Sequence, residues 1–90
     1  MTAFLITYDN HPPRDYDGVY ELMDVWDAVR LAESVWLVDL NASAVPVREA
    51  VKAALQPGDT VAVLELVPGA DWAIYATAAP AAWLKAHVAA

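Results

Sequence analysis

The run Ala3-Phe4-Leu5-Ile6-Thr7-Tyr8-Asp9, near the amino terminus, is the strongest structural signal in the chain. Its apolar, aromatic and β-branched residues stop at Asp9, and Asn10-His11-Pro12-Pro13 follows. A short apolar run closed by turn-forming residues is typical of a strand that is buried on both faces. The sequence therefore predicts a central strand that ends in a carboxylate. An acid in this position caps a loop, holds a metal ion or acts as a base.

The composition indicates one small domain with more aromatic residues than it can bury. The chain has 90 residues, of which 59% are hydrophobic, with four Trp and four Tyr. Such a surplus points to a surface for self-association. No apolar run approaches the ~20 residues of a transmembrane helix, and no secretory signal pattern is recognisable. We therefore expect a cytoplasmic homodimer with no membrane contact.

Charge and cysteine content exclude several classes of function. The net charge is −7, from twelve acidic and five basic residues, and there is no cysteine. Disulfides, thiolate metal sites and cysteine nucleophiles are therefore excluded, and the composition suits a reducing compartment. Binding to a nucleic-acid backbone depends on Lys and Arg that displace counterions. The acidic balance disfavours tight nucleic-acid binding and leaves a protein partner as the alternative.

Hydrophobic periodicity divides the rest of the chain into helices and strands. Large residues at helical spacing predict a helix over 16–26. Alternation over 28–40, weakest at 32–34, predicts two strands separated by a bulge or bend. The other expected elements are a helix over 43–55, a strand over 60–67, a strand over 72–77 and a short tail helix from 80 to 87.

This order predicts an α+β fold, a ferredoxin-like βαββαβ sandwich with an extra C-terminal strand and a short tail helix, as one domain over 1–90. Two helices would cover one face of the sheet. The other face and the last strand would then be free to pair with a second copy. We expect Trp72, Ile74 and Tyr75 of that strand to contribute to the dimer interface.

Three features together resemble a known family. They are the apolar strand that ends in Tyr8-Asp9, the helix that follows it, and the segment Arg30-Leu31-Ala32-Glu33-Ser34-Val35-Trp36. The combination resembles the CRISPR-associated protein two family, the small ferredoxin-fold dimer of CRISPR adaptation modules, and is closer to its SinR-like relatives. In that family the first-strand Asp of each subunit lies near the dimer axis and is proposed to hold a divalent metal for phosphodiester cleavage. The resemblance implies Asp9 as a catalytic and metal-binding residue with Mg²⁺ or Mn²⁺ and Arg30 as a phosphate contact, and it also extends to Ser34, which has no His or Asp at the spacing of a catalytic triad.

Elementary chemistry leaves each of these residues with a second interpretation. Two carboxylates in close contact raise one another's pKa unless a cation or a shared proton relieves the repulsion. Mg²⁺ would do so, because it accepts one or two carboxylates together with water and phosphate oxygens. Alternatively, Asp9 accepts backbone N–H groups of its own loop. His11 is a candidate base or ligand or a solvent-exposed loop residue, and Arg30 alternatively pairs with an acid such as Glu33 or Asp27.

Two function hypotheses follow. The acidic surface and the aromatic surplus favour a non-catalytic homodimer that acts as a protein-interaction or scaffold module. The family resemblance supports the alternative, a Mg-dependent phosphodiesterase or nuclease dimer that uses Asp9 from each subunit at the two-fold axis.

Overall fold

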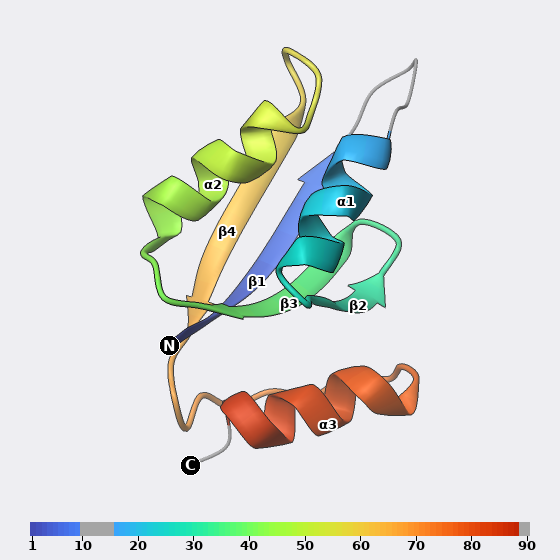
Figure 1. Ribbon diagram of the computed structural model, residues 1–90. Helices are drawn as coiled ribbons and strands as arrows, with labels where there is room; N and C mark the ends of the chain where they lie inside the picture. Colours follow the sequence, from blue (N-terminus) through green and yellow to red (C-terminus); the bar gives the residue numbers. More distant parts are fainter. Residues whose placement is uncertain (10–15, 89–90) are drawn as a thin grey trace.

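The first strand forms where the sequence predicts it and lies inside the sheet. A computed structural model describes residues 1–9 and 16–88 of the chain. The elements are β1 (Thr2–Asp9), α1 (Asp17–Val25), β2 (Val29–Ala32), β3 (Val35–Leu40), α2 (Ala44–Ala53), β4 (Thr60–Leu66) and α3 (Ala78–His87). The strand order is β2-β3-β1-β4, and every neighbouring pair is antiparallel (Figure 1). β1 is therefore flanked by a strand on each side.

Alternate residues of β1 belong to two separate hydrophobic clusters, because successive side chains of a strand point to opposite faces. Phe4, Ile6 and Tyr8 are buried in the cluster that contains Val19 of α1 and residues of α2. Ala3, in contrast, is buried in a second cluster with residues of α3. The sheet thus has α1 and α2 on one face, called the α1/α2 face below, and α3 on the other, called the α3 face (Figure 1).

Helix α1 buries the predicted stripe and ends in a well-defined cap. Val19 and Met23 are its fully buried residues. At its C-terminal end, Asp27 has a left-handed backbone with φ 56°, and its N–H donates to the carbonyl of Asp24. The N–H of Ala28 donates to the carbonyl of Met23. These two bonds form a Schellman motif, which satisfies carbonyl groups that the end of a helix otherwise leaves open.

The interruption predicted at 32–34 is confirmed. β2 and β3 are separate strands joined by a tight turn, and their register shifts between Arg30 and Ala32, which marks a bulge. A bulge bends its strand and weakens further pairing along that edge. The 28–40 segment is therefore a bent two-stranded ribbon at one edge of the sheet.

Helix α2 packs against the sheet through Val47 and Val51, and a tight turn then leads into β4. Gly58 has φ 88°, and the N–H of Asp59 donates to the carbonyl of Gln56. The Asp59 carboxylate in turn accepts the N–H of Gln56 at 2.8 Å. Proline followed by a glycine with positive φ is the sequence that a type II turn requires, so Pro57-Gly58 ends the helical segment and reverses the chain.

Two predictions are wrong: that residues 72–77 form a strand, and that one whole face of the sheet is open. Residues 71–77 form no strand. Trp72 and Ile74 pack on the α3 face with Trp83 and Leu84 of α3, so the segment crosses this face instead of reaching a sheet edge (Figure 1). The result is a small α+β fold with a four-stranded antiparallel open sheet and three helices among the described residues, compatible with the ferredoxin-like class.

Candidate functional site

Asp9 lies at the exposed end of β1, where it is in register with Thr60 of β4. The alternation of β1 places it on the α3 face, beyond Ala3, Leu5 and Thr7. No group of three or more His, Asp or Glu side chains within residues 1–9 and 16–88 is placed to hold a metal ion. His11, the predicted neighbour of Asp9, lies outside the described residues.

Arg30 is held inside a ring of neighbours on the α1/α2 face. Its guanidinium donates to the backbone carbonyl of Glu33 at 2.7 Å, to that of Ala32 at 3.3 Å and to the hydroxyl of Tyr20 at 3.0 Å. It also lies over the rings of Tyr20 and Trp36, at 5.1 and 5.3 Å from their centroids. The contact with Glu33 is thus to its carbonyl, not to the predicted carboxylate partner. These interactions fasten the β2–β3 turn to α1.

An aromatic series extends from this arginine into the core. The indole N–H of Trp36 donates to the hydroxyl of Tyr8 at 3.1 Å. Tyr16 stacks on Tyr20 with ring centroids 5.5 Å apart, and it lies 6.2 Å from the Tyr8 ring. Burial raises the pKa of Tyr8 above its ordinary value, although the hydrogen bond from Trp36 opposes the shift. A neutral phenol that accepts from Trp36 is therefore the stable form in the core. The end of β1 is also joined to the β2–β3 turn, since the N–H of Tyr8 donates to the carbonyl of Ser34.

Sequence reasoning missed one pair of titratable groups. Nδ1 of His87 lies 2.9 Å from the carbonyl of Trp83, and Nε2 lies 3.7 Å from the carboxylate of Asp39. Because a carbonyl only accepts, Nδ1 carries the proton and Nε2 faces Asp39. A hollow of about 310 Å³ beside this pair is also lined by Trp26 and Asp27. The sequence did contain one indication of this pair. Asp39 is an acid at a position of β3 whose side chain, by the alternation of the strand, faces the cluster under α3.

The three residues predicted at a dimer interface do not share one environment. Trp72 and Ile74 are half-buried in the cluster under α3. Tyr75, in contrast, is fully exposed. Other large apolar residues are exposed singly, at Met1, at Val25 of α1 and at Val45 of α2, whereas Leu64 on β4 and Val67 just after it, each 52% exposed, lie close together along the chain. Leu64 lies on the α3 face, opposite half-buried Leu5 and away from the part that α3 covers.

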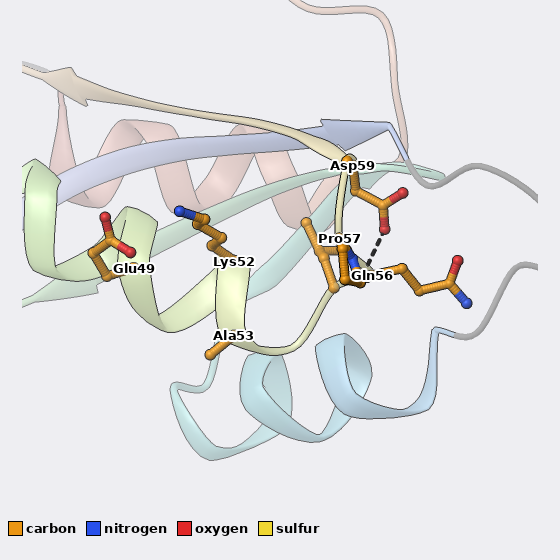
Figure 2. A pocket seen from close by; sticks show the side chains of 8 residues that line it. Glu49, Lys52, Ala53, Gln56, Pro57 and Asp59 are labelled. Atoms are coloured by element: carbon orange, nitrogen blue, oxygen red, sulfur yellow. Dashed lines mark hydrogen bonds between the residues drawn. The ribbon is translucent and has the colours of Figure 1, made fainter.

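The outer flank of α2 lies beside β4 and differs in charge from the rest of the chain. Ala50, Ala53 and Ala54 line the groove toward α1, whereas Glu49 and Lys52 line a hollow of about 340 Å³ on the other flank. Figure 2 shows both side chains projecting from the same side of α2, with the turn to β4 at the end of the hollow. Arg48 donates to Glu49 at 2.8 Å. This bond, together with Lys52, lowers the pKa of the Glu49 carboxyl.

Comparison with protein-family models, with curated protein sequences and with solved structures found no match. Among the described residues, no helix combines the length and apolar character that a membrane span requires.

Proposed function

We propose that this chain is a homodimeric, non-catalytic interaction module of the ferredoxin-like class, related to the CRISPR-associated protein two and SinR-like family. The observation that carries the proposal is the exposed apolar surface of β4, where Leu64 is 52% exposed in the middle of the strand. On the α3 face Leu64 adjoins Ala62 of the same strand and half-buried Leu5 of β1. Contiguous apolar surface of this kind, unlike a single exposed residue, marks an interaction site. A cytoplasmic setting accords with the absence of cysteine.

The net charge restricts where two copies can meet. Each copy carries −7, so like-charged surfaces repel except where acids are few. The neighbours of Leu64 on the α3 face are Ala62 on the same strand and Leu5 opposite, and none of these is charged. This surface is therefore suited to a second copy or to a protein partner, and unsuited to a nucleic-acid backbone.

Analytical ultracentrifugation between 1 and 100 μM tests this proposal. We expect a dimer in this range, with a mass twice that of the 9.7 kDa chain. A protein that remains monomeric throughout the range contradicts the proposal.

The second candidate is a Mg²⁺- or Mn²⁺-dependent phosphodiesterase that uses Asp9 of each subunit. It is favoured by the exposed carboxylate at the end of the central strand, on the same face as Leu64. Cleavage of single- and double-stranded RNA and DNA with either metal, by the wild type and by Asp9→Asn, tests it. Metal-dependent cleavage that disappears in Asp9→Asn supports this candidate, and cleavage that survives the substitution contradicts it.

A further inference from the structure

We infer that two copies join edge to edge through β4, which would create one continuous eight-stranded antiparallel sheet across a two-fold axis. The inference rests on the proposed homodimer and names its interface. β4 is an outer strand of the sheet, and no other described strand pairs with its outer side. An outer strand presents unpaired N–H and C=O groups, which form a template for another strand.

The two edges of the sheet differ in their protection against such pairing. At the β2 edge the strand has four residues, contains a bulge and carries Arg30. Short length, bulges and charged side chains are the devices that protect edges. At the opposite edge, β4 has seven residues, contains no proline or lysine and carries Glu65 as its one charged side chain. Only the β4 edge is therefore suited to a second copy.

The length of β4 selects one register for the pairing. A two-fold axis at Val63 pairs all seven residues from Thr60 to Leu66 with those of the second copy. An axis at Ala62 or Leu64 leaves two residues at one end unpaired. The Val63 register also places Glu65 opposite the partner's Val61, whereas an axis at Glu65 would bring two like charges together, which is destabilising.

Charge on α2 fits the same register. α2 runs antiparallel to β4, so Lys52, near the start of β4, lies far from Glu65 of its own strand. Across the axis, Glu65 meets the start of the partner's β4, where the partner's Lys52 lies. Arg48 and Lys52 are two of the five basic residues of the chain. Because Glu49 and Asp59 line the same hollow, this flank is close to neutral within a strongly acidic molecule, so two copies repel each other least here.

Single-cysteine cross-linking of the full chain tests the edge-to-edge pairing, and the wild type contains no competing thiol. Val63→Cys places two thiols opposite each other on the axis, at the spacing of a cross-strand pair. Val67→Cys is the matched control, because its two thiols would lie eight residues apart along the paired strands. Under mild oxidation we expect Val63→Cys to form a covalent dimer at least tenfold faster than Val67→Cys. If Val63→Cys fails to fold, the double variant Ala62→Cys/Leu64→Cys replaces it, because position 62 of one copy lies opposite position 64 of the other.

A second pair of variants tests whether association depends on β4. Leu64→Lys places two like charges diagonally across the axis, and we expect it to raise the dimer dissociation constant at least tenfold. Val25→Lys adds the same charge at a residue that is 80% exposed on α1 and should leave association unchanged.

The possible outcomes distinguish an error in the proposed β4 interface from an error in the proposed homodimer. Fast cross-linking at the axis together with weakened association of Leu64→Lys supports edge pairing. A wild-type dimer without selective cross-linking, or one that Leu64→Lys leaves intact, overturns the edge interface and leaves the proposed homodimer standing. A wild-type monomer at 100 μM overturns both.

Discussion

The guanidinium of Arg30 makes the kind of contacts that hold a turn together. It donates to two carbonyl groups of the β2–β3 turn and to a hydroxyl of α1, and it lies over two aromatic rings. Cation–π contacts at exposed sites contribute about 0.5–1 kcal/mol, and hydrogen bonds to charged groups about 1.5–3 kcal/mol. Arg30 is exposed, so solvent reduces these values. These internal contacts are sufficient to explain a stabilising role for Arg30, and no phosphate ligand is needed to account for the residue.

We predict that Arg30→Lys lowers the free energy of unfolding by about 1–2 kcal/mol, because a lysine cannot reproduce the planar fork of donors. Urea unfolding followed by tryptophan fluorescence measures the change. The control is Arg48→Lys on α2, whose ion pair with Glu49 is solvent-exposed. It should cost less than about 0.5 kcal/mol. Equal stability of Arg30→Lys and wild type would contradict the stabilising role.

Tyr8 gives the protein a pH-dependent stability. Burial raises its pKa in the folded state, so the unfolded chain ionises first as the pH rises past the ordinary value of about 10. The contribution of Tyr8 is therefore fully present below pH 10 and is lost as the pH rises through the folded pKa.

We predict that Tyr8→Phe lowers the free energy of unfolding by about 1 kcal/mol at pH 8, because Trp36 loses its acceptor. Between pH 10 and 11 the variant should lose less stability than wild type. Urea midpoints at pH 8, 10 and 11 measure both effects, with the exposed Tyr75→Phe as the matched control. An equally steep alkaline loss in Tyr8→Phe would count against the assignment.

At the level of elements, α3 completes a second core on its own face of the sheet. Leu84 is 4% exposed and lies in one cluster with Ala3 and Leu37 of the sheet. The N–H of Gly69 donates to the carbonyl of Val88, which fixes the end of this segment beside the exit of β4. α3 is therefore an integral part of the domain and not an appended tail.

We predict that Leu84→Ala lowers the free energy of unfolding by about 2–4 kcal/mol, the range for truncation of a buried leucine. Its neighbour Lys85 is exposed, and Lys85→Ala should change stability by less than about 0.5 kcal/mol. Chemical denaturation at one fixed protein concentration compares the two. A cost below about 1 kcal/mol for Leu84→Ala would mean that α3 is only loosely attached.

The sequence correctly predicted the helices and strands whose pattern is set by neighbouring residues. The predictions were wrong where the packing of distant segments determines the structure. The apolar run of β1, the stripe of α1 and the break between β2 and β3 each follow from periodicity and turn residues. Residues 72–77 alternate between apolar and other side chains as a strand does. Such alternation shows that one side of an extended segment is apolar, but not that its backbone pairs with a sheet. Trp72 and Ile74 use their apolar side to cover the sheet, not to pair with it. The approach of His87 to Asp39 depends on where α3 docks, which no local pattern contains.

Across the whole molecule, the uneven charge distribution provides a test of the β4 register. We predict that Lys52→Glu and Glu65→Lys each weaken dimerisation several-fold, because in the proposed register each replaces the attraction between Lys52 and the partner's Glu65 with repulsion between like charges. The double variant should recover most of the loss, since the pair is restored with reversed signs. Dissociation constants from sedimentation at 50 mM salt form the double-mutant cycle. Additive losses in the double variant would contradict the register.

The same register determines how far apart the two Asp9 residues lie. Asp9 is opposite Thr60, three residues from Val63, so the two copies of Asp9 are offset by about 20 Å along the strands. They are also separated by three strand spacings of about 4.8 Å, which gives a Cα–Cα distance of roughly 25 Å. One metal ion cannot bridge carboxylates at that distance. Edge pairing therefore favours the interaction module over the shared-metal phosphodiesterase.

We predict that Asp9→Cys, spin-labelled as the only thiol of the chain, gives a distance distribution near 25 Å in double electron–electron resonance. The exposed Val25→Cys, labelled in the same way, confirms that labelling leaves the dimer intact. The linkers broaden the distribution but cannot bring two sites at this separation into contact. Strong dipolar broadening in the continuous-wave spectrum would show that the two Asp9 positions converge. The β4 register would then be wrong, and a metal held between the two subunits would become the better explanation for an acid at the end of the central strand.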